Sequence, residues 1–120
     1  MALKLKEQMQ AVKTHKEFRF IMNGGKKTVK HTMIIFAMPR SKLQNDAKYR
    51  AGQNLIGILA SSKIGGAVQR NFAKRRYRAA IRQNLSIFDV NFVYIIVARK
   101  SAITCDFTNI ERDMSGIVVA

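Results

Sequence analysis

The first hydrophobic pattern along the chain is typical of a short amphipathic helix. Its apolar residues recur at i, i+3 and i+4, which places them on one side of a helix: Phe18, Ile21 and Met22. Thr14 and Glu17 have the form of a capping box, in which a hydroxyl and a carboxylate bind the free N–H groups of the first turn. Gly24 and Gly25 predict where the helix ends. Residues 1–13, which precede it, are expected to be loosely ordered.

The next apolar stretches predict two strands. Residues 29–38 alternate as a strand does and stop at Pro39, which cannot donate to a sheet. One face of this strand receives apolar residues: Val29, Met33, Ile35 and Ala37. The other face mixes basic, hydroxyl, aliphatic and aromatic groups, which suits contact with a ligand or solvent: Lys30, Thr32, Ile34 and Phe36. Residues 40–53 predict a loop, and residues 54–62 predict a second strand that pairs with the first as a hairpin.

Three more elements complete the predicted order. Gly65 and Gly66 open a long helix over residues 67–84. Residues 89–99 are almost continuously apolar and β-branched, which indicates a buried central strand. A second capping box over residues 108–111 predicts a last helix that ends near residue 118. The order α-β-β-α-β-α implies one crossover connection in an otherwise antiparallel sheet, with room for an additional short strand.

The long helix carries its charge on one side. At about 100° per residue, one side receives basic and amide groups: Arg70, Asn71, Lys74, Arg75, Arg78 and Arg82. The other side receives apolar groups, with Tyr77 at the boundary: Val68, Phe72, Ala73, Ala79 and Ala80. Successive turns lie about 5.4 Å apart, which is close to the spacing of neighbouring phosphates along a nucleic-acid strand. The helix therefore predicts a polyanion as its partner.

The charge of the whole chain favours a polyanion-binding helix rather than a helix whose basic side is only solvated. Basic residues on a solvated helix normally pair with Asp or Glu one turn away, yet no acid occurs between Asp46 and Asp89. The 22 Lys and Arg outnumber seven Asp and Glu, which gives a net charge of +15. At 120 residues and 48% hydrophobic content, the chain is expected to be one folded domain over residues 1–120.

Other features predict a soluble protein of the cytoplasm. No apolar run approaches the about 20 residues that a membrane span needs, and residues 1–16 lack the apolar core of a secretion signal. The single Cys105 excludes an internal disulfide and fits a reducing compartment. We expect a protein that is monomeric on its own and does not bind membranes.

One stretch of the sequence resembles a family signature. Residues 56–82 follow the pattern G-h-x-h-S-x-K-h-G-x-A-V-x-R-N-x-x-K-R-x-x-R, in which h is apolar. The matching residues are Gly57, Ser61, Lys63, Gly65, Ala67, Val68, Arg70, Asn71, Lys74, Arg75 and Arg78. This pattern is similar to that of the bacterial ribonuclease P protein subunit. Flanking residues extend the resemblance over nearly the whole chain, from about residue 12 onward.

The resemblance implies a fold and separate roles for a catalytic RNA and the protein. The fold is a two-layer α+β sandwich of the ribosomal-protein type, with a left-handed β-α-β crossover around the basic helix. A catalytic RNA cuts precursor tRNA at its 5′ end with Mg²⁺, bound chiefly by the RNA, and the protein helps to bind the single-stranded 5′ leader. Residues expected to bind the catalytic RNA are Lys63, Arg70, Asn71, Lys74, Arg75, Arg78 and Arg82. Residues expected to bind the leader are Phe18, Met22, Lys30 and Phe36.

Two positions depart from the family pattern. The family usually has an arginine where this chain has Phe72, and an aromatic residue where it has Met22. The helical projection places Phe72 on the apolar side, so the lost charge is expected to cost little RNA affinity. Met22 offers a polarizable apolar surface but cannot stack as a ring does.

No constellation of side chains predicts that the protein itself is a catalyst. Phosphodiester hydrolysis by a protein needs clustered carboxylates for metal ions, or an acid–base set of His or Lys. Glu111 and Asp113 are expected in the first turn of the last helix, where the helix dipole accounts for them. His15, His31 and Cys105 have no partner at metal-ligand or catalytic spacing. We therefore expect no catalytic residue and no metal site in the protein.

Two alternatives stay open from the sequence alone. A ribosomal or chaperone-like protein that only coats RNA would have the same charge and fold, but it does not explain the ordered Lys, Arg and Asn set. A DNA-binding helix-turn-helix is disfavoured, because the basic helix follows a strand and not a short helix and turn.

Overall fold

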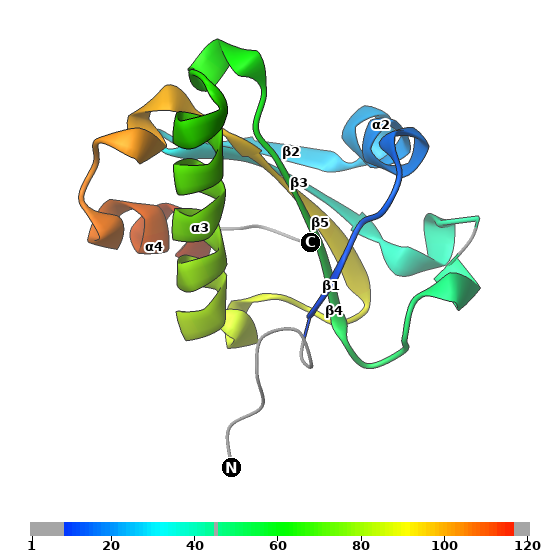
Figure 1. Cartoon of the computed structure of the whole chain (residues 1–120). Coiled ribbons are helices and arrows are strands. Elements are labelled where there is room, and N and C mark those ends of the chain that lie inside the picture. Colours follow the sequence, from blue (N-terminus) through cyan, green and yellow to red (C-terminus); the bar gives the residue numbers. More distant parts are fainter. Residues whose placement is uncertain (1–8, 45, 117–120) are drawn as a thin grey trace.

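The structure is a computed structural model that describes residues 9–44 and 46–116. Figure 1 shows its helices packed against a five-stranded sheet with strand order β1-β4-β5-β3-β2. The elements are β1 (Met9–Ala11), α2 (His15–Gly24), β2 (Lys26–Val29), β3 (Met33–Pro39), β4 (Asn54–Leu59), α3 (Ala67–Gln83), β5 (Phe92–Ala98) and α4 (Phe107–Ser115). Among these residues, no helix combines the length and the apolar character that a membrane crossing needs.

Strand β5 lies at the centre of the sheet, as its apolar sequence predicts. It pairs in parallel with β4 and antiparallel with β3, and residues 93–96 are buried. The connection from β4 through α3 to β5 is the predicted crossover. The predicted hairpin between the first two strands is wrong, because β4 lies between β1 and β5 instead of beside β3. The most apolar strand takes the centre, since only there are both of its faces covered.

The predicted strand over residues 29–38 is in fact a hairpin. Strands β2 and β3 are joined by a turn in which the Lys30 N–H donates to the Met33 carbonyl at 2.8 Å. The assignment of Met33, Ile35 and Ala37 to one face is confirmed. Val29 instead pairs opposite Ile34, so it lies on the other face, and Lys30 and Thr32 belong to the turn.

The described part of the amino-terminal segment is more ordered than predicted. Strand β1 pairs in parallel with β4 at the edge of the sheet, and Val12 after it is buried. Residues 1–8 lie outside the described residues. The described residues of the 40–53 loop are irregular, as predicted, and include two short 3₁₀ turns, η1 (Arg40–Lys42) and η2 (Asp46–Lys48).

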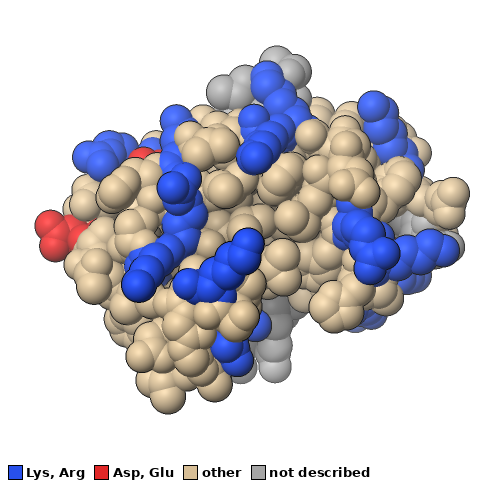
Figure 2. Space-filling view, turned by 90° about the horizontal axis from the view of Figure 1, so that it is seen from above, with Lys and Arg blue, Asp and Glu red and all other residues tan. Residues whose placement is uncertain are grey.

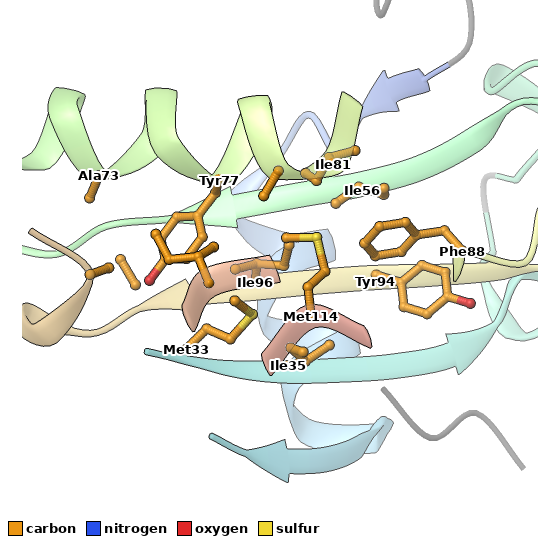
Figure 3. Close-up of a cluster of buried hydrophobic side chains, with 14 of the residues drawn as sticks. Met33, Ile35, Ile56, Ala73, Tyr77, Ile81, Phe88, Tyr94, Ile96 and Met114 are labelled. Atoms are coloured by element: carbon orange, nitrogen blue, oxygen red, sulfur yellow. The ribbon is translucent and has the colours of Figure 1, made fainter. Parts of the chain in front are cut away.

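Helices α3 and α4 cover one face of the sheet and close a core there, shown in Figure 3. From α3, Tyr77 is fully buried, and its hydroxyl donates to the Thr32 carbonyl in the β2–β3 turn. From α4, Asp113 Oδ2 accepts from the Thr32 N–H at 3.0 Å and from its hydroxyl at 2.7 Å. The small Ala73 and Ala80 are also fully buried and let α3 approach the sheet closely.

The last helix begins earlier than predicted. Helix α4 starts at Phe107 after an Asp106 N-cap that makes no side-chain capping bond, so the capping box at residues 108–111 is wrong. Glu111 and Asp113 are not in the first turn. Glu111 accepts from the Asn84 side-chain amide at 2.9 Å, and Asp113 binds Thr32, so tertiary contacts account for both carboxylates. The predicted end of the helix near residue 118 lies outside the described residues.

Helix α2 packs on the opposite face of the sheet. Its N-cap is Thr14, whose hydroxyl accepts the Glu17 N–H at 3.2 Å, and Gly25 caps its other end. The Glu17 carboxylate does not complete the predicted capping box. It accepts instead from the Thr14 hydroxyl, from Lys48 Nζ at 2.6 Å and from the Tyr49 hydroxyl at 2.8 Å. Glu17 thereby ties the 40–53 loop to the start of α2.

Candidate nucleic-acid interface

The first candidate surface is the basic side of α3 and the turn before it. The chain leaves β4, forms the 3₁₀ turn η3 (Ser62–Ile64) and enters α3 through Gly65 and Gly66. Gly65 has φ of +142°, a conformation that favours glycine. This connection places Lys63 next to the first turn of α3. We call the following set the α3 comb: Lys63, Arg70, Asn71, Lys74, Arg75, Arg78 and Arg82.

The structure places six members of the α3 comb on one side of α3 and the seventh, Lys63, in the turn before it. Asn71, Arg75, Arg78 and Arg82 are exposed, while Arg70 and Lys74 are half-buried at the edge of the packed side. Arg70 donates from Nη1 to the Gly65 carbonyl at 3.1 Å, so this side chain also fixes the turn. Within the described part of the chain, no carboxylate pairs with any member.

The apolar side of α3 is rotated from the predicted one. Its buried residues are spaced i, i+4, i+7 and i+8: Ala73, Tyr77, Ala80 and Ile81. The predicted burial of Val68 and Phe72 is wrong, because their side chains are 77% and 38% exposed. Tyr77, which we predicted at the boundary between the basic and apolar sides, lies at the centre of the packed side. Phe72 is large and apolar, so it weighs heavily when the apolar side is predicted from helical positions. In the structure the small alanines face the sheet instead, because they allow the helix to pack more closely.

Arg76 differs from the members of the α3 comb. Its Nη1 donates to the Ala102 carbonyl at 2.8 Å, which ties α3 to the 3₁₀ turn η5 (Lys100–Ile103). The guanidinium also lies 5.6 Å from the centre of the Phe72 ring. Arg76 is half-buried and helps to hold α3 against η5, whereas most of the comb residues are exposed.

The basic surface continues beyond α3. Figure 2 shows Lys and Arg side chains spread across one face of the molecule, with acidic side chains near one edge only. A depression of ≈ 680 Å³ lies between η3, the first turn of α3 and η5. Its lining includes Lys63, Ser101 and Lys100, the last of which the sequence did not single out. Ammonium and hydroxyl groups around a depression at a helix start are suited to phosphate oxygens.

The second candidate surface is the sheet face under α2. Strand pairing aligns two rows of side chains across this face. One row holds Lys27, Phe36, Ile95 and Gly57, and the next holds Val29, Ile34, Val97 and Leu59. We call the second row the open row, because Val29 is 55% exposed and the other three are half-buried.

Helix α2 covers the first row and borders the open row. The Phe18 ring lies directly over Gly57, where an added Cβ would come within 2.8 Å of two ring carbons. Phe18 and Met22 are half-buried between α2 and the sheet, and Ile21 is fully buried. The glycine at position 57 thus makes room for the ring. Two of the four predicted leader-binding residues, Phe18 and Met22, border this surface together.

The other two predicted residues of this group lie elsewhere. Phe36 is only 8% exposed and belongs to the core beneath α2, so this part of its strand face is covered by the helix and is not the open ligand surface that we expected. Lys30 lies in the β2–β3 turn, where an added Cβ on Gly116 would come within 2.7 Å of its Nζ. The turn breaks the alternation and carries Lys30 to α4. Lys27 takes its place beside Phe36, with Nζ 6.0 Å from the ring centre.

The carboxylates of the described residues do not form a catalytic cluster. No three His, Cys, Asp or Glu side chains in this part of the chain come together as metal ligands. Burial raises the pKa of Asp113, but hydrogen bonds from Thr32 and the charges of Arg112 and Lys30 bring it below its usual value. The pKa of Glu17 is likewise raised by burial and lowered more by Lys48, Tyr49 and Thr14. Both are ionised structural groups.

Comparison with known proteins identifies the family. The family model described as Ribonuclease P matches residues 6–119. The chain belongs to the ribonuclease P protein family. It is 31% identical over 114 residues to a ribonuclease P protein component of Rickettsia rickettsii, covering 91% of this chain and 94% of that one. A relative from Nitratiruptor is 29% identical over 110 residues, covering 92% and 90%.

Solved structures confirm the fold of this ribonuclease P family member. The RNase P protein of Staphylococcus aureus matches with a TM-score of 0.67 at 21% identity, over 87% of each chain. The RNase P protein from Thermotoga maritima matches with a TM-score of 0.67 at 20% identity, over 88% of this chain and 91% of that one. The expected α+β fold is therefore confirmed, with two short strands, β1 and β2, beyond the predicted order.

Proposed function

We propose that this protein is the protein subunit of a ribonuclease P ribonucleoprotein. In this proposal a catalytic RNA cuts the 5′ leader from precursor tRNA, and the protein binds both RNAs. The observation that carries the proposal is the α3 comb: seven basic or amide side chains on one side of a turn and helix, without a paired carboxylate among the described residues. Family membership supplies the kind of assembly to which such a surface belongs.

The α3 comb is proposed to bind the catalytic RNA. Guanidinium forks bind phosphate oxygens in pairs, and the Asn71 amide both donates and accepts hydrogen bonds. The comb lies on a helix whose packed side is fixed by Tyr77 and Ala73, so its charges are held in a row before RNA arrives. Folded RNA offers a continuous phosphate backbone to such a row.

The open row and α2 are proposed to bind the 5′ leader. A half-buried aromatic ring, Phe18, and the aliphatic open row provide flat apolar surface, while Lys27 supplies charge at the margin. Bases stack on such surfaces without regard to sequence, since every base has a π-face. A leader that varies between precursor tRNAs suits this tolerance.

The catalytic Mg²⁺ is proposed to be bound by the RNA. The described protein residues lack a carboxylate or histidine cluster that fits a metal ion, so no step of the reaction is assigned to a protein ligand. The protein contributes substrate binding and charge neutralisation, and we propose that it works in the cytoplasm as a monomer outside its RNA complex.

The deciding experiment is cleavage of a precursor tRNA at low Mg²⁺ by a bacterial ribonuclease P RNA, with and without the protein. We expect correct 5′ cleavage with both components and none with the protein alone. Tight RNA binding without rescue of cleavage would instead support a protein that only coats RNA.

A double variant tests the α3 comb within the same assay. Lys74→Ala with Arg78→Ala is expected to weaken assembly with the catalytic RNA and to reduce the slope of log affinity against log salt by about 1.4–1.8, at about 0.7–0.9 per phosphate contact. Lys42→Ala with Arg50→Ala removes two charges from the 40–53 loop as a matched control. Equal slopes for the two double variants would contradict the assignment.

A further inference from the structure

A pocket on the outer side of α2 is not used by either proposed RNA surface. It has a volume of ≈ 240 Å³ and lies between α2 and the residues that follow η1. Lys16, Phe20 and Asn23 line it from one row of the helix, at i, i+4 and i+7, and Leu43 and Gln44 line it from the loop. On the helix this row points away from Phe18 and Met22, by about 100° per residue. The pocket is thus separated from the open row by α2 itself.

The lining combines a flat apolar surface with hydrogen-bonding groups. Phe20 is 43% exposed, although an aromatic side chain of this size is normally covered in a core. Leu43, only 8% exposed, adds a second apolar surface. Asn23 and Gln44 carry amides that both donate and accept, as the edges of nucleobases do. Pockets for drug-sized ligands have volumes of about 300–1,000 Å³. This pocket, at ≈ 240 Å³, is smaller and suits a single planar ring system.

The charges at the pocket select an anionic ligand. Lys16 and Arg19 line it and are exposed, and neither forms an ion pair within the described residues. Glu17 is the one carboxylate in the described lining, and Lys48 already pairs with it at 2.6 Å. A ring system that carries a negative charge beside it, as a nucleotide does, matches both the apolar surfaces and the two cations.

The walls of the pocket are held in place. Glu17, on α2, accepts from Lys48 and from the hydroxyl of the buried Tyr49, on the loop. The Tyr49 hydroxyl in turn accepts the Lys13 N–H at 3.2 Å. These bonds fix the 40–53 loop against α2, so a ligand does not have to order the two walls, which lowers the cost of binding.

We propose that this pocket binds one unstacked nucleotide of the precursor's 5′ leader, upstream of the nucleotides that lie on the open row. The base would stack on Phe20, and its phosphates would face Lys16 and Arg19. The leader is favoured over the catalytic RNA because α2 also borders the open row, whereas α3 packs on the opposite face of the sheet. A helix is about 10–12 Å across, so a strand leaving the open row passes it within a few nucleotides. This inference rests on the proposed leader binding and extends it.

The test measures binding of precursor tRNAs with leaders of one to about twelve nucleotides to the assembled ribonucleoprotein. Phe20→Ala is expected to lower affinity for long leaders about 5- to 150-fold, the equivalent of stacking at about 1–3 kcal/mol per base. Short leaders, which end on the open row, are expected to bind as to the wild type. Phe20→Tyr keeps the ring and is expected to retain affinity at every length.

A second variant keeps the test independent of Phe20. Arg19→Gln is expected to reduce the salt dependence of binding for long leaders only, by about 0.7 in the slope. An equal loss for long, short and absent leaders, or a loss in binding the catalytic RNA alone, would overturn the proposal, as would unchanged affinity in both variants. If the wild-type protein itself did not respond to leader length, leader binding as a whole would be wrong, and the pocket with it.

Discussion

The two faces of the sheet use apolar residues in opposite ways. On the face under α3 and α4, which we call the closed face, Tyr77, Ile96 and Met114 are fully buried. On the face under α2, the open row keeps Ile34, Val97 and Leu59 only half-buried. Both faces come from the same strands, and along β5 adjacent residues belong to different faces. Both faces therefore contribute buried core, but only the face under α2 also keeps a row of apolar side chains available to a ligand.

Substitutions at two adjacent residues of β5 are expected to show this difference with the largest change in the free energy of unfolding. Ile96→Ala on the closed face is expected to lower the free energy of unfolding by about 2–5 kcal/mol, because it leaves a cavity. Val97→Ala on the open row is expected to cost about 1 kcal/mol, since its methyl groups are already partly in water. Urea unfolding of both variants measures the contrast. Equal losses would mean that the open row is packed as tightly as the core.

A substitution of Asp113 tests how much the hydrogen bonds between α4 and the β2–β3 turn stabilise the closed face. Asp113→Asn is expected to destabilise the protein by about 1–3 kcal/mol at neutral pH, because the bonds from Thr32 lose their charged acceptor. The folded-state pKa lies below the usual 3.8, with Arg112 and Lys30 as the nearby cations. The wild-type carboxylate therefore stabilises the fold fully above pH 3.8, and this contribution is lost as the pH falls through the lower folded pKa.

Unfolding at a series of pH values from 6 down to 2.5 measures this effect. The difference between wild type and Asp113→Asn is expected to shrink below pH 3.8. Glu17→Gln is the matched control on the other face, where the usual pKa of 4.5 is also lowered. Its difference from wild type should begin to shrink nearer pH 4.5. A gap for Asp113→Asn that stayed constant over the whole range would contradict the assigned role.

A substitution of Phe18 is expected to have a small effect on stability and the most direct effect on RNA binding. Phe18→Leu keeps an apolar side chain over Gly57 and is expected to cost less than about 1.5 kcal/mol in unfolding. It removes the ring, so affinity for leader-bearing precursor tRNA should fall while affinity for the catalytic RNA stays. Phe36→Ala, by contrast, is expected to act mainly through stability, since Phe36 is only 8% exposed. A leader-specific loss from Phe36→Ala in a stably folded protein would reverse this assignment.

The elements with strong local signals were predictable from the sequence. The amphipathic pattern of α2 with Thr14 and Gly25 at its ends, the glycine entry to α3 and the apolar run of β5 all specify structure within a few residues. The basic side of α3 was predictable for the same reason, because its charges recur at the helical period. These features depend on short-range chemistry.

The remaining features depend on partners far away in sequence. Strands β1 and β2 have three and four residues and exist because β4 and β3 pair with them. Lys30 was misplaced because a turn, held by groups from α3 and α4, interrupts the alternation. The pocket beside Phe20 needs the 40–53 loop against α2, and no local pattern predicts that contact. Phe36 looked accessible because α2 above it could not be placed from the sequence.

The contacts of Thr32 have a consequence for how the chain folds as it is synthesised. Its carbonyl is bound by Tyr77, 45 residues later, and its N–H and hydroxyl by Asp113, 81 residues later. At synthesis rates of about 5–20 residues per second, the second partner follows Thr32 by about 4–16 seconds. The turn stays incomplete until Asp113 has been synthesised, and the whole of α3 has been synthesised before that point. The basic helix thus emerges from the ribosome before the helix that completes its core.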